Sequence, residues 1–359
     1  MLHLAAAVDQ PSAYDAASYV GLARLAESGG FDFVTLHDTF ARPGLDALAV
    51  LSRVVPATRR IGLVPTVTTT HTEPFHVQAA VATLDWLSQG RAGWRLDVSG
   101  TASEARLFGR PHPAALGLAD AGEPPYPADA LWQEAGEVAD VAAKLWDSRE
   151  DNPGKKKVPA DRDTLHPVDF RGTTFSVKGP SPVPRPPQGH PVRVVDATDA
   201  AARRTAARYA DVALVHAVST AQTAAVRDQL RAQAAGFGRD PDELRVFAGL
   251  LVDLGDGEHA AEPGHGGGGP RQSARGPLYR GGPVDLAELI ATWHAEGAVD
   301  GFHLTPAEPF RDLERLVNGT AALLQHRGLF RTFYPGGTLR EHLGLARPAN
   351  QYAVAGGVA

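Results

Sequence analysis

Hydrophobic and polar positions alternate along most of the chain between short apolar runs and longer helical patterns. The apolar runs cover residues 2–8, 31–36, 61–69, 92–98, 192–196, 212–218, 244–252 and 301–304. The stretches with apolar residues three and four apart cover 14–28, 45–58, 73–87, 131–146, 199–209, 221–235, 284–295 and 310–326. Strands that alternate with helices predict a parallel sheet, because parallel neighbours need a crossover connection. Eight such units predict an α/β fold, the (β/α)8 TIM barrel.

Three segments interrupt this rhythm. Residues of about 100–130, 150–190 and 255–283 are rich in Gly and Pro, and the third contains the glycine run 266–269. We interpret them as insertions after strands four and seven of a single domain, 1–359, with a C-terminal extension at 328–359. The third is low in apolar residues, which favours a mobile loop and makes it a candidate lid. A doubly wound sheet with a second domain is the rival fold, but its common glycine-rich first turn is absent, because that turn reads Asp9-Gln10-Pro11-Ser12.

Composition narrows the function classes. Lys and Arg number 35 against 41 Asp and Glu, a formal charge of −6, which argues against a nucleic-acid surface. The chain has no cysteine, so disulfides, thiolate metal sites and a cysteine nucleophile are excluded. No segment approaches about 18 uninterrupted apolar residues, and the N-terminus does not have the pattern of a signal peptide. We therefore expect a cytoplasmic protein with a small-molecule substrate, and no nucleic acid or membrane partner.

Polar residues at the predicted strand ends are the candidates for chemistry, because TIM-barrel enzymes work at the C-terminal ends of the strands. They are His37, Asp38, Thr68, Thr69, Thr70, His71, Arg95, Asp97, Ser99, Asp196, Thr198, His216, Asp253, His303 and Thr305. Other interpretations stay open: Asp38 also suits a turn cap, threonine is a common strand residue, and single histidines are often structural.

Two further patterns bear on the type of site. The turn from Thr198 to Arg203 combines a hydroxyl, small residues and a cation before a helix, which suits a phosphate as well as ordinary helix capping. The segment from His71 to His76 holds no metal-binding pair four residues apart on one helix, since Pro74 separates the two histidines, so no metal is expected. The G-x-S-x-G turn of serine hydrolases is absent.

The run RIGLVPTVTTTHTEPFHVQAAVATLDWLSQGRAGWR, from Arg60 to Arg95, resembles the flavin-binding core of the bacterial luciferase-like monooxygenases. The likeness extends to residues 31–38, 144–148, 166–180, 206–211 and 327–350, and it is greatest to the branch of nitrilotriacetate and dibenzothiophene-sulfone monooxygenases. The resemblance implies a flavin-dependent oxidoreductase of the two-component type. Such an enzyme uses reduced FMN from a separate flavin reductase, together with O2, to oxygenate a small organic substrate. It also implies a homodimer or homotetramer.

By the same resemblance, Asp38, Thr68 and Thr69 line the flavin ring pocket, and Ser99 lies near the flavin or substrate. The turn with Thr198, Asp199 and Arg203 holds the flavin phosphate. Arg95, His71 and His303 are the candidates for the catalytic groups, with Arg95 also placed beside the cofactor.

This chain departs from the branch at several of these positions. Arg95 replaces the usual Asn, and Ala197 and Ala202 replace glycines that let backbone approach a phosphate closely. Asp199 stands at a serine position and adds negative charge. Two alternatives to the FMN monooxygenase therefore remain: a noncatalytic barrel that acts as a partner or binding protein, and an F420-dependent oxidoreductase.

Overall fold

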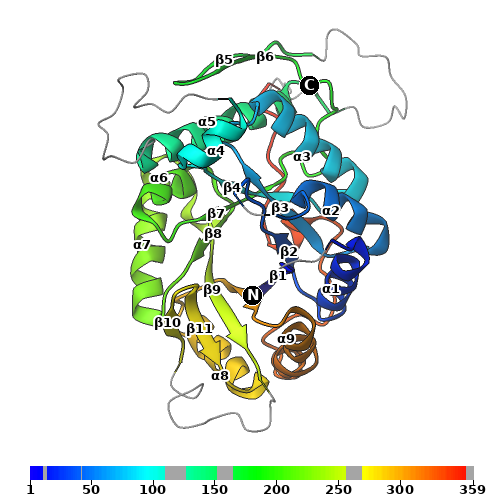
Figure 1. Ribbon diagram of the computed structural model, residues 1–359, viewed down its shortest axis with the longest axis vertical. Helices are drawn as coiled ribbons and strands as arrows, with labels where there is room; N and C mark the ends of the chain where they lie inside the picture. The colour runs from blue at the N-terminus through cyan, green and yellow to red at the C-terminus, as the bar shows by residue number, and fades with distance from the viewer. Residues whose placement is uncertain (11–13, 42, 110–126, 152–164, 256–268, 353–359) are drawn as a thin grey trace, which may run out of the picture.

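Parallel strands close into a barrel in the computed structural model, which describes residues 1–10, 14–41, 43–109, 127–151, 165–255 and 269–352 (Figure 1). Within these ranges the barrel strands are β1 (His3–Ala7), β2 (Phe33–Leu36), β3 (Gly62–Thr68), β4 (Gly93–Asp97), β7 (Val192–Asp196), β8 (Val212–Val215), β9 (Arg245–Asp253) and β12 (Gly301–Pro306). Strand β12 pairs in parallel with both β1 and β9, and β9 also pairs with β8, so the sheet has no open edge among the barrel strands. The predicted TIM barrel is confirmed.

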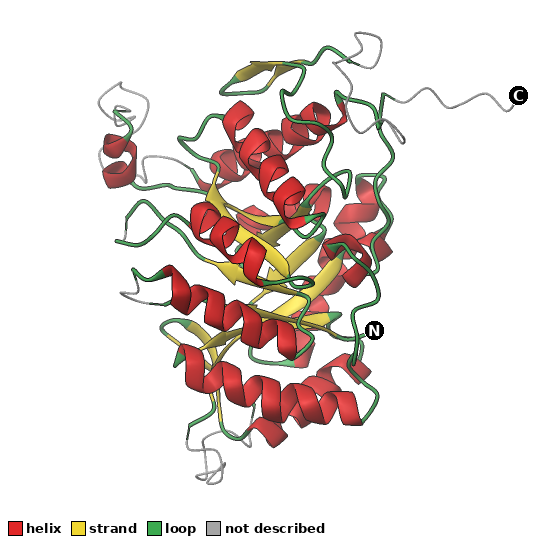
Figure 2. Ribbon diagram, turned by 90° about the vertical axis from the view of Figure 1, so that its right-hand side faces the viewer, coloured by secondary structure: helices red, strands yellow, loops and turns green. Residues whose placement is uncertain are grey.

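Helices cover the outside of the barrel (Figure 2). They are α1 (Ala16–Ser28), α2 (Ala47–Val54), α3 (Pro74–Ser88), α4 (Ala102–Leu107), α5 (Ala128–Asp147), α6 (Ala200–Tyr209), α7 (Thr220–Gly236), α8 (Pro283–Ala295), α9 (Pro309–Arg315) and α10 (Ala322–His326). A further short helix, α11 (Leu339–His342), lies in the C-terminal extension. Short polar side chains set several starts, as where Asp15 accepts the N–H of Ala17 at 3.0 Å and Asp46 that of Ala49 at 2.6 Å. A π-helical segment, Leu316–Ala321, joins α9 to α10.

The C-terminal extension closes one end of the barrel. Leu339 and Leu343 of this extension join the apolar cluster inside the barrel, where they pack with side chains such as Phe33 and Val64. A Cβ added at Gly62 would lie 2.6 Å from Leu339 Cδ1, so glycine at this position makes room for Leu339. We call the part of the extension that fills this end of the barrel the plug. Within the described residues this leaves the opposite end, where the C-terminal ends of the strands lie, for a ligand to enter. We call that end the mouth.

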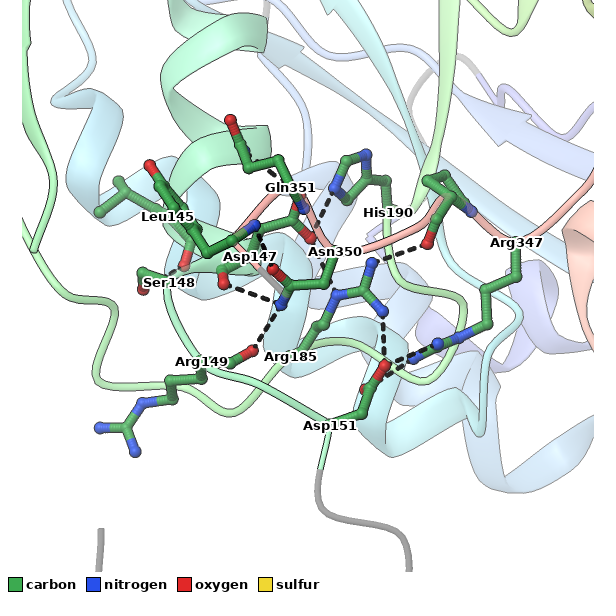
Figure 3. A network of polar contacts seen from close by, with 12 residues as sticks. Leu145, Asp147, Ser148, Arg149, Asp151, Arg185, His190, Arg347, Asn350 and Gln351 are labelled. Atoms are coloured by element: carbon green, nitrogen blue, oxygen red, sulfur yellow. Dashed lines mark hydrogen bonds and ion pairs between the residues drawn. The ribbon is translucent and has the colours of Figure 1, made fainter. Parts of the chain in front are cut away.

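Polar contacts hold the extension against the rest of the molecule (Figure 3). Arg185 is buried and donates to Asp147 Oδ1 at 2.8 Å, to Asp151 Oδ2 at 2.7 Å and to the carbonyl of Pro348 at 2.7 Å. Asn350 donates to the carbonyl of Asp147 at 2.9 Å. Because these contacts join the end of α5 to the C-terminal residues, the plug is fixed to the outer helices.

The predicted insertions have more structure than the sequence indicated. Part of the second forms a hairpin of β5 (Asp169–Arg171) and β6 (Ser176–Lys178), which lies apart from the barrel at the top of Figure 1. Part of the third forms a hairpin of β10 (Arg271–Ser273) and β11 (Gly276–Arg280), and β11 pairs in parallel with β9. The expectation of a mobile loop over the whole third insertion was wrong for residues 271–280, because backbone pairing to the barrel holds them. The candidate lid otherwise falls largely on residues 256–268, outside the described residues.

Candidate active site

An ion-paired cluster lies inside the barrel near the mouth. Arg95 of β4 donates to Asp196 Oδ2 of β7 at 3.2 Å, and His216 Nδ1 lies 3.4 Å from the same oxygen. Burial alone would raise the pKa of the Asp196 carboxyl, but the neighbouring His216 and Arg95 and the hydrogen bonds from Thr198 hold that pKa below its ordinary value. Asp196 is therefore a carboxylate that fixes the direction of the Arg95 guanidinium.

Close packing against a glycine fixes the His216 ring. A Cβ added at Gly249 of β9 would lie 2.0 Å from His216 Cδ2, a distance no carbon pair tolerates. The imidazole ring of His216 thus occupies the space that a side chain at position 249 would fill. The hydroxyl of Thr198 accepts the backbone N–H of His216 at 3.1 Å and lies 3.2 Å from its Nδ1.

His303 lies deeper and is electrically neutral at neutral pH. Its Nε2 lies 2.8 Å from the hydroxyl of Thr35, and the residue is only 3% exposed. Burial first, and then the neighbouring Arg95 and His216, lower the pKa of His303 to about 3. Its Nδ1 is buried without a hydrogen-bond partner among the described residues. His303 can therefore offer a hydrogen bond at this depth, but it carries no charge there.

A buried carboxylate ties two loops of the mouth together. Glu104 of α4 accepts the hydroxyls of Ser99 at 2.7 Å, Thr101 at 2.7 Å and Thr39 at 3.0 Å. Burial opposes its charge, but these hydrogen bonds outweigh it and lower the pKa of Glu104. The Ser99 hydroxyl is thus directed at Glu104, and the loops after β2 and β4 are held together.

An aromatic group of three rings lies beside these loops. The ring of His71 stacks on Phe108 with centroids 5.4 Å apart, and Phe40 meets Phe108 edge to face at 4.6 Å. His71 has a φ of 69°, in the left-handed region that residues other than glycine rarely adopt. Strain of this kind is often found at functional sites.

The turn after β7 is held by its own side chains. Arg203 donates to the carbonyls of Ala197 at 3.2 Å and Thr198 at 3.1 Å, and to Gln229 Oε1 at 2.9 Å. Asp199 precedes α6 as its N-cap residue, but its side chain makes no capping bond and is exposed. A phosphate at this turn would therefore meet the free backbone N–H groups of α6 and the Asp199 carboxylate, with the Arg203 guanidinium engaged in shaping the turn.

A cavity of about 610 Å³ opens at the mouth, a size within the range of about 300–1,000 Å³ of small-molecule pockets. It is lined by Asp9, Gln10, Tyr14, Tyr19, Leu36, His37, Asp38, Thr39, Pro43, Gly44, Leu45, Arg95, Arg275 and Thr305. The mixture of polar side chains with Leu36 and two tyrosine rings suits a planar ligand with polar edges.

Of the strand-end residues predicted from the sequence, His37, Asp38, Arg95 and Thr305 line this cavity. Asp38 also accepts the N–H of Ala47 at 3.0 Å, so it holds the start of α2. The lining does not include the other residues that the resemblance assigned to the site, which are Thr68, Thr69, His71, Ser99, Thr198, Asp199, Arg203 and His303, nor the strand-end candidates Thr70, Asp97, Asp196, His216 and Asp253. The hydroxyl and the N–H of Thr69 both donate to the carbonyl of Asp97, at 3.0 and 2.8 Å.

Sequence reasoning missed several residues of the mouth. Asp9 and Gln10 follow the first strand, so the rule that selected the other strand-end residues could have found them. Glu104 and Arg275 carried no such signal, since both fall in segments interpreted as irregular. Among the described residues no group of three His, Asp or Glu side chains could hold a metal ion, and no helix is long and apolar enough to cross a membrane.

Comparison with known proteins extends the resemblance seen in the sequence. The family model described as luciferase-like monooxygenase matches residues 1–342. Component A of nitrilotriacetate monooxygenase from Aminobacter aminovorans is 30% identical over 430 residues, which cover 95% of this chain and 92% of that protein. Dibenzothiophene-sulfone monooxygenase from Rhodococcus erythropolis is 27% identical to this chain, and the alignment covers 93% of this chain and 90% of that protein. The structure of EDTA monooxygenase from Chelativorans sp. BNC1 shares the fold with a TM-score of 0.82 at 21% identity, covering 96% of this chain and 99% of its own.

Proposed function

Because the chain belongs to the luciferase-like monooxygenase family over residues 1–342, we propose that it uses reduced FMN and O2 to oxygenate a small organic substrate. The enzyme is a monooxygenase of the two-component type with a flavin cofactor, and a separate reductase supplies the reduced flavin. The observation that carries the choice of activity is the match of one family model along nearly the whole chain. The cavity at the mouth of the barrel is compatible with it.

The flavin ring would lie in the mouth cavity against Asp38, with Thr68, Thr69 and Ser99 on the neighbouring strand ends. Its phosphate would lie at the turn with Thr198, Asp199 and Arg203. The ring and the phosphate of the flavin would then both contact residues at the C-terminal ends of the barrel strands. The bound flavin supplies the two electrons that activate dioxygen.

The protein side chains would position groups and exclude water. Arg95 is held by Asp196 and keeps a fixed positive charge at the cavity wall. His303 is neutral at neutral pH, so we assign it hydrogen bonding below the reacting centre. His71, with its constrained backbone, stacks on Phe108 and would support the loops beside the cavity.

Anaerobic equilibrium binding tests this proposal. Reduced FMN, oxidised FMN and reduced F420 are titrated separately into the purified protein, with free and bound cofactor separated by ultrafiltration. We expect reduced FMN to bind most tightly. Binding of F420 alone would replace FMN in the proposal, and binding of none of the three would remove the enzyme assignment and favour a noncatalytic barrel.

We also propose that the chain forms a homodimer or homotetramer through α3. The outward side chains of this helix include Phe75, His76, Thr83, Trp86 and Leu87, and none of them is an acid, lysine or arginine. Trp86 and Leu87 are 47% and 55% exposed. An outer helix face without charge is unusual for a surface in water and suits a contact between copies.

A further inference from the structure

Three hydrogen-bond donors in the mouth cavity have no acceptor. Gln10 Nε2 and Arg95 Nε are buried and make no hydrogen bond within the part of the chain that the structure describes. Arg275, which lines the same cavity from the β10–β11 hairpin, has an exposed guanidinium for which the described residues provide no hydrogen bond or ion pair. Buried polar groups are nearly always satisfied, so Gln10 Nε2 and Arg95 Nε indicate a missing acceptor, and the exposed Arg275 adds a second positive charge beside them.

Both arginines are held at fixed places. Asp196 fixes Arg95, as described above. The N–H of Arg275 donates to Ser273 Oγ at 3.1 Å, and that hydroxyl donates to the carbonyl of Gly276 at 2.6 Å, which locks the hairpin turn. Strand β11 then pairs with β9, with Leu278 opposite Leu251. The turn that carries Arg275 is therefore anchored to the barrel sheet through β11.

The acidic residues of the cavity do not serve as the missing acceptor. Asp9 Oδ1 accepts the backbone N–H of His37 at 2.7 Å, and Asp38 Oδ2 accepts that of Ala47, so each holds its own loop. Neither carboxylate lies within ion-pair distance of Arg95 or Arg275 among the described contacts. The buried side-chain atoms that these contacts leave unsatisfied, Gln10 Nε2 and Arg95 Nε, are thus both donors, and Arg275 brings a second cation to the cavity wall.

We propose that the substrate of this enzyme bears a carboxylate, which binds between Arg95 and Arg275 with Gln10 as a further donor. A guanidinium matches a carboxylate because it can donate two parallel hydrogen bonds to its two oxygens. Arg275 is then a specificity-determining residue that the flavin itself does not need. This inference rests on the proposed function, and the FMN phosphate is the competing source of an oxyanion for the same two arginines.

Calorimetric titration with succinate and with its neutral diamide, succinamide, separates these cases. Each is titrated anaerobically, at constant ionic strength, into free protein, protein loaded with reduced FMN and protein loaded with reduced riboflavin. We expect succinate to bind both flavin-loaded forms and succinamide to bind neither. Arg275→Gln should weaken succinate binding at least about tenfold, as the loss of a charged hydrogen bond predicts, and leave the affinity for reduced FMN unchanged. Arg271→Gln, on the same hairpin but outside the cavity lining, is the matched control and should change neither affinity.

Two kinds of outcome overturn the inference, and a third separates it from the proposed function. Equal binding of succinate and succinamide, or of neither, removes a carboxylate site. Loss of succinate binding on loading with FMN but not with riboflavin assigns the arginines to the cofactor phosphate, as does weaker FMN binding by Arg275→Gln. If reduced FMN fails to bind while free protein still binds succinate through Arg275, the anion site stands and the flavin assignment falls.

Discussion

Replacement of His303 by glutamine should remove a specific part of the acid sensitivity of the fold. His303 is buried, and its pKa falls from 6.5 to about 3 in the folded protein. In the unfolded chain an imidazole binds a proton as the pH falls through its ordinary pKa, whereas folded His303 does not. The neutral His303 side chain thus makes its full contribution to the free energy of unfolding above about pH 6.5. This contribution is lost as the pH falls toward the folded pKa of His303.

The magnitude follows from the two pKa values. Between pH 7 and pH 5 the unfolded imidazole becomes almost fully charged and folded His303 stays neutral, which costs about 2 kcal/mol of unfolding free energy. Glutamine keeps a polar group near Thr35 but does not titrate. The His303→Gln variant should therefore lose about 2 kcal/mol less than the wild type over this interval, whatever its stability at pH 7.

Urea denaturation followed by tryptophan fluorescence at pH 7 and pH 5 measures the difference. His326→Gln, at an exposed position of α10, is the matched control for the loss of one histidine. Parallel pH dependence of the wild type and His303→Gln would refute the reasoning, because it would mean that His303 takes up a proton in the folded state by pH 5.

Three further substitutions test other parts of the site. Gly249→Ala should displace the His216 ring and lower the free energy of unfolding, measured by chemical denaturation, by about 1–3 kcal/mol. Gly236→Ala, whose added Cβ meets nothing within 4 Å, should not lower it. Equal effects of the two substitutions would disprove the packing argument. Asp199→Ser should tighten reduced-FMN binding about two- to fivefold, the effect of about 0.3–1 kcal/mol for one charge at a helix N-terminus, with reduced riboflavin unaffected. Weaker FMN binding by that variant would contradict the assignment of this turn to the phosphate. Leu87→Glu should shift the mass measured by light scattering toward the monomer, and an unchanged mass would exclude α3 as the contact.

The sequence predicted the barrel well because alternation of strands and helices depends on local patterns. All eight predicted barrel strands are present, and most of their ends differ by one or two residues. Strand β8 ends at Val215, so His216 follows the strand and does not lie on it, and β12 runs on to Pro306. The predicted last helix is interrupted by the π-helical turn Leu316–Ala321, which depends on packing against α8 and left no mark in the hydrophobic pattern.

Features that depend on contacts between distant residues could not be predicted. The hairpin with Arg275 is stabilised by pairing to β9, and its own sequence is too polar to indicate a strand. The role of Glu104 arises from hydroxyls of Thr39 and Ser99, which only the closed barrel brings together. The resemblance implied where Asp38 and Arg95 belong, but not that Asp196 would hold Arg95.

A crystal structure of the protein grown anaerobically with reduced FMN tests the central claim most directly. The account predicts density for the three fused rings in the mouth cavity, beside Asp38 and within contact of the Arg95 wall, with the phosphate at the turn of Thr198. A mouth without flavin density at saturating FMN, or a flavin bound at any other surface, would contradict it.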